Sequence, residues 1–343
     1  MIELPAVQEG RDSTGLRYLS ASNLRQPRLL RRAKPLLGTL VEIACAVPDQ
    51  VYSGVHSAPS RGSATLPGAD AALAASEAAF AAIARVQRLM SRHEATSDLS
   101  RFNAAAPGHW TAVAPDTLTV FAFALHLSAQ SGGIFDVCAA CSQDEAGQTG
   151  TGQPSAGSWR DVEIDLQRGA LRKHAPLRAD LGGVAKGYAV DAAVYAMQHA
   201  GVGNREGESG EGQSDEGTSA KCQSGKGPSG WVNAGGDLRV FGDLEMPVRV
   251  RSPQDLSDTV ACVRLRDRAA ATSACYLQSA AADPSAQSVL RHGISRQPVA
   301  YGKSWTVAAP CCMAADALTK LVAATGNAQH PLLAHYAAQA WIF

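Results

Sequence analysis

The stretch DLGGVAKGYAVD places a carboxylate, two adjacent glycines, a lysine, a third glycine and a second carboxylate within residues 180–191. The glycine pair stands between a strand-like segment and a helical pattern, where the missing side chains let a ligand approach the backbone closely. The start of the helix offers free N–H groups and the positive end of its dipole to an anion. The spacing fits neither GxxxxGK[ST] nor GxGxxG. The pattern fits either a phosphate or nucleotide site or a tight helix start capped by Asp180.

Two further glycine pairs are also followed by an aspartate. Gly235 and Gly236 precede Asp237 in VNAGGDLRVFG, and such a pair between strands is more often a bulge or bend than a ligand site. The pair in SGGIFDVC is followed by Phe135 and Asp136. These two residues provide either core packing with a cap, or a platform for a flat ring with a polar anchor.

Three polar residues share one turn near the start of the last predicted helix. Asp316 is followed by Thr319 and Lys320 in ADALTKLV, and the spacings of three and four residues put all three on one helical face. They either cap the helix or provide ligands for a hard cation such as Mg²⁺, which prefers carboxylates, hydroxyls and substrate phosphates.

The elements that position these residues follow from hydrophobic periodicity. Helices are predicted over 70–91, 116–131 and 184–199, followed by a last helix that ends at Gly326. Strand-like segments are LLGTLVEIAC, a hairpin over 162–174, and the segments WVNAGGDLRVFG, MPVRVRSP, TVACVRLRD and SWTVAAP. Several strands in succession at hairpin spacing favour an α+β fold, in which helices pack on a mixed, largely antiparallel sheet.

The chain of 343 residues is interpreted as one large domain over 34–343 with a flexible leader over 1–33. Two segments depart from the globular pattern. Residues 48–68, rich in Ser, Gly and Pro, are predicted to form a loop insertion. Residues 201–230, rich in Gly, Ser and Glu, contain too few apolar side chains to offset the entropy of ordering, so we expect a disordered insertion.

Charge and composition limit the partners. The formal net charge of 0 gives no field that would attract nucleic acid. No segment has the length and hydropathy of a membrane span and no secretory signal is visible, so we expect a cytoplasmic protein.

The eight cysteines are expected to be reduced. Cys138 and Cys141 form a CxxC pair that has no second pair at zinc-site spacing, so buried thiols are the favoured interpretation.

The order of these motifs resembles one known family. The segments LGT-VEI, SDLSRFN, SGGIFDV, DLGGVAKGYAVD, VNAGGDLRVFG, ATSACY and ADALTKLV, spread over 37–325, resemble the FAD:protein FMN transferase (ApbE) family. DLGGVAKGYAVD is the most specific of them. The resemblance implies an enzyme that binds FAD, uses Mg²⁺, transfers FMN to a threonine or serine hydroxyl of an acceptor flavoprotein, and releases AMP. The acceptor would be its macromolecular partner.

The resemblance also implies roles for individual residues. Lys186 would lie beside the phosphates, Leu37 would pack on the flavin, and Asp316 would be the principal metal carboxylate. The positions that match catalytic roles are Lys186, His292 and Lys320. The positions that match FAD contacts are Leu37, Ile134, Phe135, Asp136, Asp180, Lys186, Thr272 and Ser273. The positions that match the metal site are Gly183, Asp316 and Thr319.

The sequence departs from the family pattern at three places. Lys320 stands where the family has a threonine metal ligand, and its ammonium would either take over part of the role of the cation or exclude it by repulsion. The segment SVLRHGISRQP keeps His292 but lacks the Asp-Pro and Thr-Gly of the family. Ala274 replaces a glycine. Two alternatives therefore stay open: an FAD-binding protein without transfer activity, and a Mg²⁺-dependent FAD pyrophosphatase that gives FMN and AMP.

Overall fold

The computed structural model describes residues 28–47, 68–139, 157–200, 228–255, 257–274, 290–299 and 302–343. Its largest element is a seven-stranded sheet in which every pair of neighbouring strands is antiparallel. In spatial order the strands are β1 (Arg28–Leu36), β2 (Thr39–Val47), β6 (Gly230–Ala234), β7 (Asp237–Phe241), β10 (Ala269–Ala274), β11 (Ser304–Ala309) and β12 (Gln339–Ile342).

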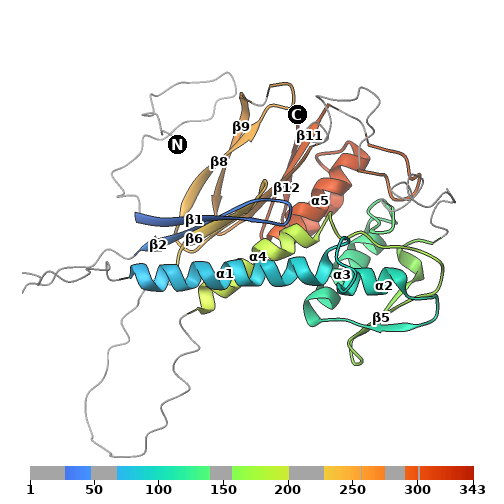
Figure 1. The fold of residues 1–343 in the computed structure, drawn as a ribbon. Helices are drawn as coiled ribbons and strands as arrows, with labels where there is room; N and C mark the ends of the chain where they lie inside the picture. Colours follow the sequence, from blue (N-terminus) through green and yellow to red (C-terminus); the bar gives the residue numbers. More distant parts are fainter. Residues whose placement is uncertain are drawn as a thin grey trace, which may run out of the picture.

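Three helices cover one face of this sheet (Figure 1). Helix α1 (Ala69–Met90) packs on β1, β2 and α4 (Ala185–His199), and α5 (Cys312–Thr325) packs on α4, β10 and β11. The main core lies between these layers, because strand residues such as Val41 and Ile43 alternate inward against apolar helix faces. A hairpin of β8 (Glu245–Arg251) and β9 (Thr259–Arg266) covers the other face over a smaller apolar cluster.

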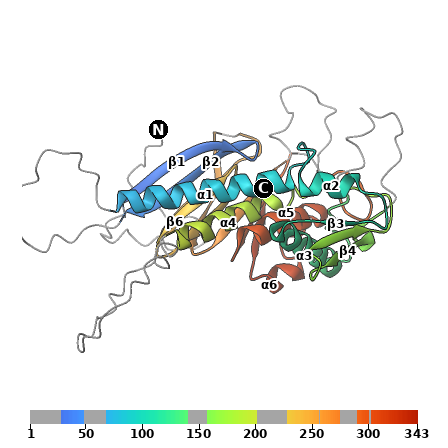
Figure 2. The ribbon, with the colours of Figure 1, turned by 60° about the horizontal axis from the view of Figure 1, so that its bottom comes forward.

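A smaller layer lies at one end of the molecule (Figure 2). It contains the three-stranded antiparallel sheet β3-β5-β4 and the helices α2 and α3. The elements of this layer are α2 (Asp98–Ala104), β3 (Trp110–Ala112), α3 (Pro115–Gln130), a 3₁₀ turn (Trp159–Asp161), β4 (Val162–Asp165) and β5 (Ala170–Lys173). A short helix, α6 (Pro331–His335), precedes β12.

Two tight hairpin turns lie at one end of the large sheet. Leu37 and Gly38 join β1 to β2 with φ of 55° and 70°, and Gly235 and Gly236 join β6 to β7 with φ of 63° and 103°. Positive φ at both central residues is the two-residue turn that matches the twist of antiparallel strands. The turns are adjacent, because a Cβ on Gly235 would lie 2.6 Å from Thr39 Oγ1. The Gly-Gly pair is therefore the turn between two strands.

The α+β fold with a largely antiparallel sheet is confirmed, and each of the four expected helices is present. The expected leader is wrong for residues 28–33, which form the first part of β1. Its remainder lies outside the described residues, as do 48–67 of the expected loop and 201–227 of the expected disordered insertion. Cys138 is buried, whereas Cys141 is not described. Within the described ranges, no helix is long and apolar enough to cross a membrane.

Candidate active site

The DLGGVAKGYAVD stretch begins with a turn that Asp180 stabilises. Asp180 Oδ1 accepts the Gly182 N–H at 2.7 Å, and the Asp180 N–H donates to the carbonyl of Val137 at 2.8 Å. The other carboxylate oxygen is 3.9 Å from Nη1 of Arg92. Asp180 is thus held between the start of α4 and the loop that follows α3.

The rest of the stretch brings the N-termini of α4 and α5 together. A Cβ on Gly187 would lie only 2.3 Å from the carbonyl oxygen of Cys312, so this position admits no side chain without a shift of the backbone. Asp191 accepts the N–H groups of Cys312 at 2.9 Å and Met313 at 2.8 Å. In return Asp316 Oδ2 accepts the Gly187 N–H at 3.2 Å. Each aspartate provides acceptors that the first turn of the other helix lacks.

Lys186 forms an ion pair with Asp237, the first residue of β7. The Nζ to Oδ2 distance is 2.9 Å, and the Asp237 side chain is 2% exposed. Burial and the nearby charge of Asp316 raise the pKa of Asp237 to about 6, although Lys186 and Lys320 oppose this shift. Burial lowers the pKa of Lys186, but the carboxylates of Asp237 and Asp316 outweigh that effect, so its pKa lies above its usual value. Lys186 is therefore a cation at neutral pH.

A second ion pair joins Lys320 to Asp316, one helical turn apart on α5. The Lys320 ammonium contacts Oδ1 of Asp316, whose side chain is fully buried. The stem of Lys320 passes Gly183, because a Cβ there would lie 3.2 Å from Cε of Lys320. Thr319 Oγ1 is 2.6 Å from Ser273 Oγ and 2.7 Å from the carbonyl oxygen of Asp316.

The donor set that the resemblance implies for Mg²⁺ does not fit a cation in this chain. One oxygen of Asp316 contacts the Lys320 ammonium, and the other accepts a backbone N–H. The Thr319 hydroxyl is bonded to Ser273 and to its own helix. A dication beside Asp316 would also meet the positive charge of Lys320 at short range. In the described part of the chain, no cluster of three or more His, Cys, Asp or Glu residues is arranged to hold a metal.

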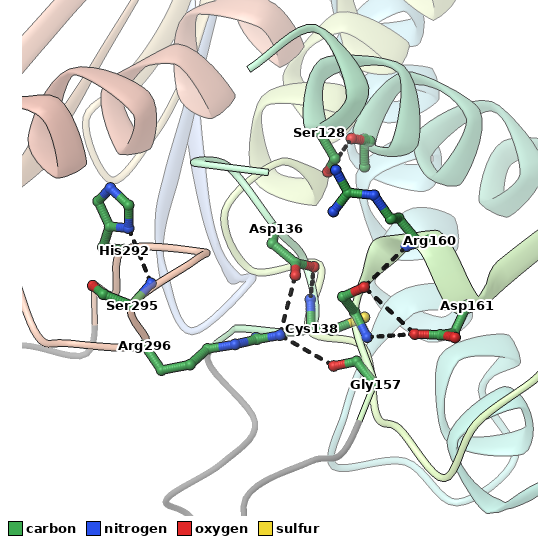
Figure 3. Close-up of polar contacts among 11 residues, drawn as sticks. Ser128, Asp136, Cys138, Gly157, Arg160, Asp161, His292, Ser295 and Arg296 are labelled. Carbon is green, nitrogen blue, oxygen red and sulfur yellow. Dashed lines mark hydrogen bonds and ion pairs between the residues drawn. The ribbon is translucent and has the colours of Figure 1, made fainter. Parts of the chain in front are cut away.

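A second group of predicted residues surrounds the loop after α3 (Figure 3). Asp136 Oδ1 accepts the Cys138 N–H at 2.8 Å, and Oδ2 lies 3.2 Å from Nη2 of Arg296. Burial raises the pKa of the Asp136 carboxyl, against the opposing effects of the Cys138 N–H and Arg296. Phe135 is 5% exposed and belongs to the main core. The described structure therefore matches core packing with a cap at this loop.

His292 lies in the 290–299 segment, which is bound to the same loop. The Gly293 N–H donates to the carbonyl of Ile134 at 2.8 Å, and the Arg296 N–H donates to the carbonyl of His292 at 2.8 Å. The Ser295 N–H donates to Nδ1 of His292 at 3.3 Å. Because Nδ1 is the acceptor, the proton of the neutral ring is on Nε2.

Two of the predicted flavin contacts, Leu37 and Thr272, lie in the β1–β2 turn and on β10. Leu37 occupies the β1–β2 turn with a positive φ that is uncommon for a leucine, and its N–H donates to Oε1 of Gln87 at 2.7 Å. Thr272 is 2.9 Å from Thr306 in an Oγ1 to Oγ1 contact. Because side chains alternate along β10, Thr272 points to the sheet face opposite Ser273.

The structure thus divides the predicted residues into two groups joined by Asp180. The first group, on the turn before α4 and on α4, α5 and β10, consists of Gly183, Lys186, Ser273, Asp316, Thr319 and Lys320. The second group consists of Ile134, Phe135, Asp136 and His292. Sequence reasoning missed the roles of Asp237, Asp191 and Arg296. An aspartate directly after a Gly-Gly turn was the available signal for Asp237, whereas nothing local indicated the partners of Asp191 and Arg296.

Comparison with known proteins identifies the family of the chain. The family model described as the ApbE family matches residues 37–205 and 215–342. An ApbE protein from Thermotoga maritima has a TM-score of 0.68 at 20% identity, covering 92% of this chain and 94% of its own. The apo flavinyl transferase ApbE of Pseudomonas stutzeri has a TM-score of 0.65 at 19% identity, covering 94% and 92%.

The flavin transferase ApbE of Vibrio cholerae has a TM-score of 0.59 at 22% identity, covering 87% of this chain and 88% of its own. A comparison with curated proteins found no match. Identities this low establish the shared fold alone, so the assignment depends on the family match, which extends over most of the sequence. On that ground the chain belongs to the ApbE family.

Proposed function

We propose that this protein transfers the FMN half of FAD to a threonine or serine hydroxyl of an acceptor flavoprotein and releases AMP. The observation that carries the proposal is the paired cluster at the start of α4, in which Lys186 and Lys320 lie beside Asp237 and Asp316. Two ammonium groups next to a glycine-rich turn suit the pyrophosphate of a dinucleotide. Family membership supplies the reaction class.

The proposed reaction is a displacement at phosphorus. The acceptor hydroxyl oxygen forms a bond to the phosphorus of the FMN half, and the bridging oxygen leaves with its electron pair on AMP. Lys186 and Lys320 would neutralise charge that develops on the phosphate oxygens. Lys186 is suited to this role because it is a cation whose side chain is one-third exposed.

The hydroxyl proton must leave during this displacement, and His292 is our candidate for accepting it. The ring accepts the Ser295 N–H at Nδ1, so Nε2 carries the proton of the neutral tautomer. His292 can act as a base only if this weak 3.3 Å contact opens and Nδ1 turns toward the acceptor. Both residues of this contact belong to the same 290–299 segment, so rotation of the His292 side chain is enough to open it.

The Mg²⁺ that the resemblance implies does not enter this scheme. The groups that would hold it, Asp316, Thr319 and the carbonyl of Gly183, belong to a region where Asp316 already contacts Lys320. No step of the displacement is therefore drawn through a metal. The same ion pair favours one rival function, a protein that binds FAD without transferring FMN.

Product analysis tests the proposal. The purified protein is incubated with FAD and a tagged candidate acceptor, and AMP, free FMN and protein-bound flavin are separated by chromatography. We expect AMP and acceptor-bound flavin in equal amounts, and their loss in Lys186→Met. AMP with free FMN would instead indicate a pyrophosphatase. Tight FAD binding without AMP, across several acceptors, would indicate the binding protein.

A further inference from the structure

We infer that the Lys320 ammonium takes the place of a divalent cation, so that this site binds the pyrophosphate of FAD without a metal. The inference depends on the proposed function in one respect, which is that a dinucleotide pyrophosphate binds between the glycine turn and α5. It goes beyond the proposed function because it specifies how the site provides positive charge.

Lys320 reaches from α5 across the glycine turn to Asp316. Its stem runs past the backbone of Gly183, where a Cβ would lie 3.2 Å from Cε and 3.5 Å from Cγ. Its ammonium ends on Oδ1 of the fully buried Asp316. Lys320 therefore lies between the glycine turn and the carboxylate, where the resemblance places a cation. The absence of a side chain at Gly183 leaves the room that the lysine stem uses.

The oxygen donors near Lys320 already have partners in the protein. Asp316 Oδ2 accepts the Gly187 N–H at 3.2 Å, so both oxygens of this carboxylate have partners in the protein. The Thr319 hydroxyl lies 2.6 Å from Ser273 Oγ and 2.7 Å from the carbonyl oxygen of Asp316. A hard cation needs several oxygen ligands that are free to turn toward it. In this chain those oxygens stabilise the contact between α4, α5 and β10.

The charged groups of this cluster balance one another. Two buried carboxylates, Asp237 and Asp316, are each paired with one ammonium, on Lys186 and Lys320 respectively. The four groups sum to zero, so they leave no excess negative charge to hold a dication. Each ammonium has three N–H donors. Because Asp316 engages one of those of Lys320, whose side chain is 18% exposed, further donors remain for phosphate oxygens.

Calorimetry of FAD binding to the full chain tests the inference, with EDTA in one buffer and Mg²⁺ in the other. We expect the two dissociation constants of the wild type to agree within about threefold. Titration with MgCl₂ in the absence of FAD should give no binding heat. A wild type whose FAD affinity falls about tenfold or more in EDTA would overturn the inference.

Two substitutions of Lys320 make the test specific. Lys320→Thr removes the ammonium and places a hydroxyl one turn after Asp316, so we expect FAD affinity in EDTA to fall about tenfold or more and Mg²⁺ to restore part of it. Lys320→Met also removes the charge but adds no oxygen, so Mg²⁺ should restore nothing. Full wild-type affinity of Lys320→Met in EDTA would contradict a role for the ammonium.

A matched control removes a cation elsewhere. Arg264→Met breaks an exposed ion pair with Glu245 on the β8–β9 hairpin, and FAD affinity should not change. If circular dichroism shows that a Lys320 variant is unfolded, the two wild-type dissociation constants, in EDTA and in Mg²⁺, test the inference without it. FAD binding that requires Mg²⁺ would refute this inference and leave the proposed function intact. No FAD binding in either buffer would refute both.

Discussion

Asp191 on α4 and Asp316 on α5 cap each other's helices. Asp191 accepts the N–H groups of Cys312 and Met313 at 2.9 and 2.8 Å, and Asp316 accepts the Gly187 N–H at 3.2 Å. The exchange fixes the two N-termini against one another, because each aspartate accepts N–H groups from the first turn of the other helix. It also fixes the position of the carboxylate that holds Lys320.

The close approach of the two helices gives the first prediction. Gly187→Ala places a Cβ 2.3 Å from the Cys312 carbonyl oxygen, so the free energy of unfolding should fall by about 1–3 kcal/mol despite the better helix propensity of alanine. Urea unfolding measures the change. The control, Gln198→Ala on the exposed side of α4, should stay within about 0.5 kcal/mol of wild type. Equal stability of the two variants would contradict the described helix contact.

The second prediction separates the two caps. Asp316→Asn keeps an acceptor for the Gly187 N–H but loses the charge that positions Lys320. FAD turnover should therefore fall about tenfold or more, and the free energy of unfolding should fall by about 1–2 kcal/mol. Asp191→Asn is the matched control, with a similar loss of stability and a much smaller loss of turnover. Turnover assays and urea unfolding of both variants measure these effects. Parallel losses of turnover in both variants would show that Asp316 acts only as a cap.

The third prediction concerns pH and Asp237. Its pKa in the folded protein is raised from 3.8 to about 6, so between these values the folded state binds more protons at this group than the unfolded chain does. This group therefore lowers the free energy of unfolding as pH rises from about 4 to about 6, by up to about 3 kcal/mol, and its effect is constant above that range.

Asp237→Asn isolates this effect, because the other titrating groups are common to both proteins. The stability of wild type relative to the variant should decrease from pH 4 to pH 6 and then level off. Chemical unfolding at a series of pH values gives this difference directly. A difference that does not depend on pH would mean that Asp237 has an ordinary pKa in the folded protein.

The fourth prediction concerns the loop segment that carries His292. Arg296 donates through Nη2 to Asp136 at 3.2 Å and to the carbonyl of Gly157 at 3.1 Å, and the Asp136 side chain is 2% exposed. Arg296→Met leaves that carboxylate without its cation and should cost about 1–3 kcal/mol of unfolding free energy.

A double-mutant cycle with Asp136→Asn gives the coupling of this pair. Because the asparagine no longer needs a cation, Arg296→Met should cost less in that background, with an interaction of about 1 kcal/mol or more. Additive losses would show that the two side chains do not interact in solution.

The sequence predicted the elements whose pattern is local. The helices over 70–91 and 312–325 were recognised because apolar residues repeat at helical spacing and Gly326 provides a left-handed end. The strand Ala269–Ala274 was missed because AAATSA has little of the β-branched or aromatic content that marks a strand. The strand Arg28–Leu36 was missed because its basic residues, tolerable at the edge of a sheet, resemble those of a flexible leader.

For the candidate site too, the sequence predicted what depends on local motifs and missed what depends on the tertiary fold. Lys186 and Asp316 were identified because their motif is contiguous in the sequence. The pairing of Lys186 with Asp237 joins α4 to β7, and that of Asp136 with Arg296 joins residues 160 positions apart. Contacts of this kind depend on how the sheet orders its strands and on where α4 meets α5. Neither periodicity nor local motifs encode that arrangement.

The most direct test of the proposed activity is the intact mass of a tagged acceptor flavoprotein after incubation with this protein and FAD. We expect an acceptor whose mass increases by one FMN moiety on a threonine or serine, together with an equal amount of AMP. The increase should be lost when Lys186→Met replaces the wild type. An acceptor of unchanged mass, with AMP and free FMN in solution, would contradict the account and identify the protein as a hydrolase of FAD.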